Sequence, residues 1–187
     1  MRELVVVRHG ETEWSRTMRH TGNTDLPLTE EGEAQARSIT ERLSGREFAL
    51  VLTSPLQRAR RTAELAGYGD RAEPDENLRE RDYGEYEGLT TKEIRRERPG
   101  WDVWRDDCPG GETLAQVGAR AERAIERAVA ADGDTLVFAH SHLLRTLAGC
   151  WIGIGPEGGG KLVLGTAAVS VLGFERERRV IKRWNWT

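Results

Sequence analysis

Cysteine is scarce in this chain and long hydrophobic runs are absent, which excludes two broad classes of protein. The two cysteines, Cys108 and Cys150, lie far apart without metal-ligand spacing and are too few to staple a small secreted fold. No apolar run approaches the roughly 20 residues that cross a bilayer, and even residues 143–154 are interrupted by Arg145 and Gly149. We therefore expect reduced thiols and no membrane-spanning segment.

A surplus of charge of one sign is lacking as well. The 28 Lys and Arg residues nearly balance the 31 Asp and Glu residues, so the formal net charge is only −3. Such a chain has no general affinity for a polyanionic backbone. We expect neither a nucleic-acid nor a membrane partner, and any anion site must be local. The chain enters a strand-like segment within its first residues, which leaves no room for a signal peptide's apolar stretch. A cytoplasmic location is therefore expected.

The length and apolar content fit one globular domain. A chain of 187 residues with 37% hydrophobic side chains can bury a sizeable core. No internal repeat, low-complexity tract or linker divides it, so we expect a single domain over residues 1–187. The sequence leaves the oligomeric state open, and a homodimer is compatible with it.

Short β-branched runs alternate with amphipathic segments along the chain. The patterns predict strands at 4–7, 48–52 and 135–139, helices over 29–43, 55–66, 113–130 and 143–151, and a terminal hairpin or strand pair at 169–174 and 180–184. The second helix is expected to start at Pro55, because proline is favoured at the first helical position. This alternation predicts an α/β fold, a three-layer sandwich with a mainly parallel central sheet, in which ligands bind beyond the carboxyl ends of the strands.

Two of the four histidines end predicted strands. His9 stands between Arg8 and Gly10, where backbone and guanidinium can approach an anion closely. His140 follows the strand at 135–139 in the same way and precedes a helix expected to start near Ser141. A neutral imidazole can attack phosphorus, and a second, protonated imidazole can hydrogen-bond the equatorial oxygens. A pair of ordinary hydrogen-bonded histidines at strand ends is the alternative interpretation.

Two further residues are candidates on weaker patterns. Arg58 lies on the predicted helix that starts at Pro55, where its guanidinium could reach a phosphate, whereas we assign Arg60 and Arg61 to a solvated face. Glu80 stands among arginines, and a carboxylate in that setting is usually an ordinary surface ion pair. By composition alone Glu80 would not be selected.

Five blocks of the sequence resemble the histidine phosphatase superfamily, also called the phosphoglycerate mutase-like family. The blocks are Arg8 to Thr12; Arg19 to Gly22 with Asp25 to Thr29 and Gly32; Thr53 to Pro55 with Arg58, Ala59, Thr62 and Ala63; Leu78, Glu80, Gly84, Glu87 and Gly88; and Ala139, His140, Leu144 and Arg145. The resemblance covers nearly the whole chain. It implies the phosphoglycerate mutase-like fold and a metal-independent phosphatase without a cofactor, acting on small phosphomonoesters such as sugar phosphates. Within the family the pattern is closest to actinobacterial broad-specificity acid phosphatases.

The resemblance also implies roles for individual residues. His9 is the nucleophile, Arg8, Arg58 and His140 clamp the phosphoryl group, and Glu80 donates a proton to the leaving group. Glu80 beside a phosphate dianion would retain its proton through like-charge repulsion, as a general acid requires.

Four other positions are expected to bind substrate. Thr21 matches a family position whose side chain touches the phosphate, and Gly22 lets the backbone come near. Ser15 and Ser141 stand where most relatives have Asn and Gly, so their contacts with the phosphate depart from the family pattern.

Other readings of the sequence remain. A phosphoglycerate mutase would use the same His9 chemistry, but the mutases of the family resemble a longer chain with a segment that covers the pocket. A non-catalytic phospholigand-binding module is a third candidate, against which the retained His9, Glu80 and His140 argue. Trp101 and Trp104 form either a substrate wall or a packing cluster.

A glycine-rich segment at 155–161 matches the first part of a P-loop. Leu162 stands where Ser or Thr should hold magnesium, and the segment follows a helix and precedes a strand, the reverse of the required context. We interpret it as a flexible surface loop.

Overall fold

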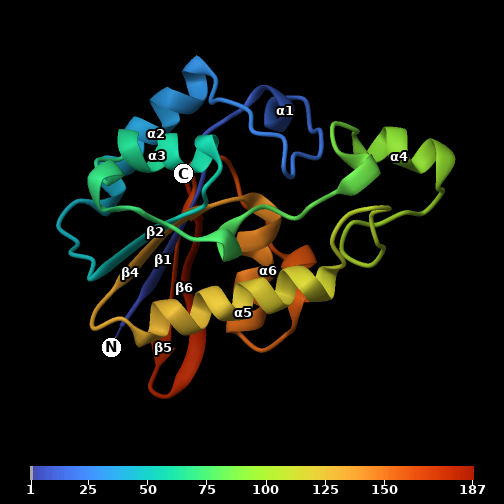
Figure 1. Ribbon diagram of the computed structural model, residues 1–187. Coiled ribbons are helices and arrows are strands. Elements are labelled where there is room, and N and C mark those ends of the chain that lie inside the picture. The colour runs from blue at the N-terminus through green and yellow to red at the C-terminus, as the bar shows by residue number, and fades with distance from the viewer. Residues whose placement is uncertain (1) are drawn as a thin grey trace.

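A computed structural model describes residues 2–187 and contains one six-stranded sheet (Figure 1). The strand order is β3-β2-β4-β1-β5-β6. The strands span β1 Leu4–Arg8, β2 Leu50–Thr53, β3 Glu73–Pro74, β4 Thr135–Ala139, β5 Val169–Glu175 and β6 Arg178–Trp186. The first four strands run parallel to one another, whereas β5 is antiparallel to both β1 and β6.

Helices cover both faces of this sheet. Helices α2 (Glu30–Leu43) and α3 (Gln57–Leu65) pack on one face, and α5 (Leu114–Ala130) and α6 (Ser141–Trp151) pack on the other (Figure 1). Strand β1 shows why: Val5 and Val7 join the core under α2 and α3, while Leu4 and Val6 join the core under α5 and α6. The predicted three-layer α/β sandwich is confirmed.

The helix starts follow capping side chains where the sequence supplies them. Thr29 accepts a hydrogen bond from Gly32 N–H, and Thr113 does so from Gln116 N–H, so α2 and α5 begin one residue after the predicted positions. The expected start at Pro55 is wrong. Helix α3 begins at Gln57, whose N–H donates to the Asp25 carboxylate at 2.8 Å.

Helix α6 begins at Ser141, where a helix was expected after His140, and thus two residues before the apolar pattern at 143–151. Its first turn contributes Ser141 and His142 to a cavity, so the apolar pattern of the sequence starts only at Leu143.

Short elements that the sequence did not predict gather beyond the carboxyl ends of the parallel strands. They include α1 (Glu13–Arg16) and α4 (Thr91–Glu97), which lie toward the same end of the sheet in Figure 1. Backbone hydrogen bonds tie their flanks together, since His20 N–H donates to Leu89 O and Gly88 N–H donates to His20 O, each at 2.9 Å. These segments enclose the space above the strand ends.

The glycine-rich segment is not the flexible loop that we expected. Residues 156–161 form a short 3-10 helix in which Gly158 and Gly159 are buried. A side chain at Gly149 of α6 would meet the carbonyl of Gly155 at 2.4 Å, so the absence of side chains lets the segment pack directly on the helix.

Two expectations from the sequence can be compared with the described residues 2–187. Cys108 and Cys150 are free and buried, in agreement with the expected reduced thiols. No helix in this range is both long and apolar enough to cross a membrane.

Gly84 and Gly100 provide a matched pair for testing how the loop after Glu80 is built. Both have positive φ, +52° and +78°, but an added Cβ at Gly84 would lie 2.0 Å from the Pro109 carbonyl, whereas Gly100 faces open space. We expect Gly100→Ala to destabilise by about 1 kcal/mol through the left-handed backbone alone. Gly84→Ala should cost about 1–3 kcal/mol more through the clash. Urea denaturation measures both, and equal losses would contradict the close approach.

Candidate active site

The two strand-ending histidines lie side by side. Strands β1 and β4 are parallel and pair Arg8 with Ala139, so the residues that follow, His9 and His140, emerge at the same edge of the sheet. Their ring centroids are 5.1 Å apart in an edge-to-face arrangement. The structure thus brings together the two imidazoles that the sequence separates by more than a hundred positions.

The His9 imidazole is set up as a nucleophile. Its Nδ1 lies 2.7 Å from the Gly10 carbonyl oxygen. Because a carbonyl can only accept, Nδ1 carries the proton and Nε2 keeps its lone pair. Burial, with the charges of Arg58 and Arg8, holds the pKa of His9 well below its ordinary value. The ring is therefore neutral across the physiological range.

The second histidine is also neutral. Arg58 Nε donates to His140 Nδ1 at 3.1 Å, so Nδ1 is unprotonated, and Nε2 donates to the Ser54 hydroxyl at 2.8 Å. Burial, Arg58 and His9 hold the pKa of His140 well below its ordinary value. This geometry corresponds to a neutral ring, whereas the sequence analysis considered a protonated second imidazole.

The two candidate arginines differ in their contacts. Arg58 is fully buried on α3, and its terminal nitrogens donate to the carbonyls of Thr24 and Gly22, each at 2.9 Å. Arg8 donates through Nη1 to the Leu164 carbonyl at 2.6 Å, but its Nε is buried without any hydrogen-bond partner. Burial lowers the pKa of Arg8 to about 10, which still leaves it charged at neutral pH. An unsatisfied buried donor beside His9 is suited to an anion.

Glu80 is held by the backbone of α6. Its carboxylate accepts hydrogen bonds from the N–H groups of Arg81, His142 and Leu143 at 2.9 to 3.1 Å. Two of these donors lie in the first turn of the helix, where N–H groups have no partner within the helix and the dipole favours an anion. The carboxylate is fixed at the site rather than on the surface, although its setting among arginines suggested a surface ion pair.

These groups surround a cavity of about 340 Å³. Six of the nine site residues predicted from the sequence line it, namely Arg8, His9, Ser15, Thr21, Glu80 and Ser141. The other three, Gly22, Arg58 and His140, are not among the lining residues. Six lining residues were not predicted: Met18, Arg19, His20, Tyr83, His142 and Arg145. His142 could have been suspected from its position two residues after His140 in a chain with four histidines.

Ser15 and Gly22, two residues predicted to bind substrate, form hydrogen bonds with nearby protein groups. The Ser15 hydroxyl closes the N-terminal turn of α1, since it accepts from Thr12 N–H and donates to Thr12 O. Gly22 donates its N–H to Glu87, and an added Cβ there would meet the Arg81 carbonyl at 2.6 Å. Gly22 is thus required for close backbone packing.

The two tryptophans have different surroundings, and neither lines the cavity. Trp101 is buried and packs edge-to-face on Tyr86 and His20. Trp104 lies against the His142 ring with 4.9 Å between centroids. Both belong to the packing behind the cavity wall.

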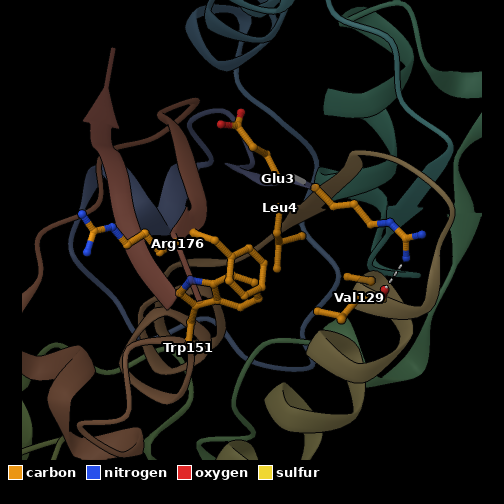
Figure 2. A pocket seen from close by; sticks show the side chains of 8 residues that line it. Glu3, Leu4, Val129, Trp151 and Arg176 are labelled. Carbon is orange, nitrogen blue, oxygen red and sulfur yellow. Dashed lines mark hydrogen bonds between the residues drawn. The ribbon is translucent and has the colours of Figure 1, made fainter. Parts of the chain in front are cut away.

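A second cavity, of about 280 Å³, lies at the opposite end of β1 (Figure 2). Leu4, Val129 and Trp151 give it an apolar lining, with Glu3 and Arg176 also beside it. It holds no histidine and no other candidate from the sequence. Nowhere in residues 2–187 do three or more His, Cys, Asp or Glu side chains gather as a metal site would require.

Comparison with known proteins identifies the class that this fold and site define. The family description "Histidine phosphatase superfamily (branch 1)" matches residues 4–187. The chain belongs to this superfamily, and the predicted resemblance is confirmed.

Individual relatives carry both phosphatase and mutase names. An acid phosphatase of Mycobacterium tuberculosis is 40% identical over 176 residues, 92% of this chain and 86% of the relative. Sedoheptulose 1,7-bisphosphatase of Saccharomyces cerevisiae is 40% identical over 186 residues, which cover 82% of this chain and 68% of the relative. A 2,3-bisphosphoglycerate-dependent phosphoglycerate mutase of Mesorhizobium japonicum is 36% identical, covering 88% of each chain.

The solved structures agree with this assignment. The solved structure of an open reading frame from Mycobacterium tuberculosis superposes on this chain with a TM-score of 0.94 at 37% identity. The match covers 100% of this chain and 98% of the solved chain. Together with the phosphatase-named relatives, this supports a phosphoric monoester hydrolase.

The histidines give a pH prediction, because burial lowers the pKa of all four: His20 to about 4, and His9, His140 and His142 well below the ordinary value. No imidazole signal should therefore titrate between about pH 5.5 and 7.5 in NMR spectra of the free protein. Below pH 6.5 the unfolded chain binds more protons than the folded one. Stability is therefore fully present above that pH and is lost as the pH falls toward 4.

Urea denaturation at pH 7 and pH 5 measures this loss. His20→Gln removes one of the four groups and should weaken the dependence. An imidazole of the folded protein that titrates near pH 6.5 would contradict the proposed burial.

Proposed function

We propose that the protein hydrolyses small phosphomonoesters through a phosphohistidine formed on His9, without a metal ion. The observation that carries this is the pairing, in one cavity, of a neutral His9 whose Nε2 is free with a buried Arg8 whose Nε has no partner. Nucleophile and cation thus converge on a place that fits a phosphoryl group.

The reaction has two halves. In the first, His9 Nε2 attacks phosphorus, the bond from phosphorus to the ester oxygen breaks, and Glu80 gives that oxygen a proton. In the second, Glu80 takes a proton from a water molecule that attacks the phosphohistidine, which releases inorganic phosphate and restores His9. Arg8, Arg58 and His140 stabilise the charge on the phosphoryl oxygens, for which the Nε2–H of neutral His140 turns from the Ser54 hydroxyl to the phosphate.

Glu80 must gain a proton when substrate binds. Three backbone N–H groups stabilise its carboxylate. A phosphate dianion arriving beside it favours the protonated form through like-charge repulsion. The same N–H donors then stabilise the carboxylate that proton donation produces.

A phosphoglycerate mutase is the second candidate, supported by the relative that is 36% identical. From the sequence we expected mutases to be longer than this chain. Chain length does not separate the two activities, because this chain spans 88% of that mutase. Relatives named as phosphatases are more similar, at 40% identity, and favour hydrolysis. A non-catalytic phospholigand-binding module would form no phosphoenzyme.

The central test uses p-nitrophenyl phosphate in buffer that contains EDTA. We expect the wild type to release phosphate and, when quenched during turnover, to carry acid-labile, base-stable phosphate that mass spectrometry places on His9. His9→Ala should abolish both. Full activity in that variant would refute the proposal. Isomerisation of 3-phosphoglycerate without phosphate release would favour the mutase, and absence of any phosphoenzyme would favour the binding module.

The role of Glu80 is tested with two leaving groups. An alkoxide needs a proton on departure, whereas nitrophenolate is stable without one. Glu80→Gln should therefore lower kcat on alkyl or sugar phosphates by about 10²- to 10⁴-fold and on p-nitrophenyl phosphate by clearly less. Equal losses on both substrates would mean that Glu80 orders the site without transferring a proton.

A further inference from the structure

Arg145 is a cation in the cavity wall that forms no salt bridge within residues 2–187. It lies on α6, and its Nε donates to the Gly159 carbonyl at 3.1 Å. Across the described chain, no carboxylate comes within salt-bridge distance of it and neither terminal nitrogen has a protein acceptor. Arg19, the other unpredicted arginine of the cavity, is paired with Glu93. Arg145 therefore lacks an ion-pair partner, whereas Arg19 has one.

The position of Arg145 is built by the surrounding packing. Its guanidinium lies over the Trp104 ring, with Cζ 4.4 Å from the centroid. Trp104 in turn rests on the glycine-rich segment, where an added Cβ at Gly159 or Gly160 would come within 2.6 or 2.9 Å of the ring. The glycines that resemble part of a P-loop thus make room for an aromatic platform that carries Arg145.

With a phosphomonoester bound, the positive charge of Arg145 is not balanced by a negative charge in the cavity. A phosphate dianion is balanced by Arg8 and Arg58, which the proposed function assigns to it. When Glu80 is protonated, as a general acid must be, no negative charge remains for Arg145. Burial lowers the pKa of Arg145, because its charge is poorly solvated there. An additional anion would remove this imbalance.

Helix geometry separates this cation from the reacting phosphate. Arg145 follows His140, the N-cap of α6, by five residues, which is about 7.5 Å along the helix axis. His142 and Ser141 lie one turn before Arg145, at the i−3 and i−4 positions that share its helix face, and line the same cavity. The face thus runs from the reacting phosphate toward Arg145.

We propose that Arg145 forms a second anion subsite and selects substrates that carry a carboxylate or a second phosphate several ångströms from the scissile phosphate. This inference rests on the proposed function, because it takes the cavity to hold a phosphomonoester at His9. Arg145 is then a specificity-determining residue, and Trp104 positions it.

Four-carbon alkyl phosphates that end in a hydroxyl, a carboxylate or a second phosphate test the subsite. We expect the wild type to favour the two anionic ends. Arg145→Gln should lower kcat/KM for them by about 10- to 100-fold, the range for a charge-assisted hydrogen bond. The loss should appear mainly in KM, because the distal group binds alike in ground and transition states. The hydroxyl-ended substrate should change by at most a few-fold.

Arg96→Gln is the matched control, since Arg96 is an exposed arginine of α4 outside the cavity. It removes the same charge and should leave the preference for anionic ends intact. A loss in Arg145→Gln confined to one anionic end supports the subsite and identifies its ligand class. Equal losses on all three substrates, or none, would overturn the proposal.

Calorimetric binding of the same three compounds to His9→Ala, with and without Arg145→Gln, separates the two proposals. If wild type turns over none of them, the proposed function fails. Tighter binding of the anionic ends that depends on Arg145 would still support the subsite, and its absence would refute it.

Discussion

The burial of Arg58 is the constraint on which the rest of the site depends. A guanidinium without exposed surface needs an acceptor for its donors, because an unpaired buried charge is strongly unfavourable. Here the acceptors are backbone carbonyls of residues 21, 22 and 24 together with His140 Nδ1. Satisfying this one side chain draws the segment after α1 against α3 and fixes the proton position on the second histidine.

The electrostatic character of the site follows from that arrangement. Arg58 and Arg8 place positive charge beside His9 in a region from which water is largely excluded, so protonation of the imidazole is doubly unfavourable. Burial keeps the ring neutral, together with the same cations that attract phosphate. Glu80 supplies the single carboxylate of the cavity lining, and the first turn of α6 keeps it there. Nucleophile, cations and acid are thus held by three different elements that meet at the strand ends.

Much of the fold could be read from local patterns. The strand at 135–139 and the ends of the helices at Leu43 and Ala130 agree with the structure residue by residue, because apolar spacing is a local signal. The start of α3 could not be predicted, since Asp25 caps it from a distant segment. The glycine-rich segment was misread for a similar reason: only contacts with α6 and Trp104 show that its glycines permit close packing rather than flexibility.

The sequence by itself determined the family, the α/β alternation and the candidates His9, Arg8, Arg58, Glu80 and His140, because these depend on residue order and short-range periodicity. Only the tertiary structure decided which nitrogen of each imidazole carries the proton and that Glu80 is held by the N-terminus of α6. It also decided that Arg145 reaches the cavity without an anionic partner. Tautomer, charge balance and cavity lining depend on groups far apart in the chain, and those distances are fixed only when the strands and helices pack.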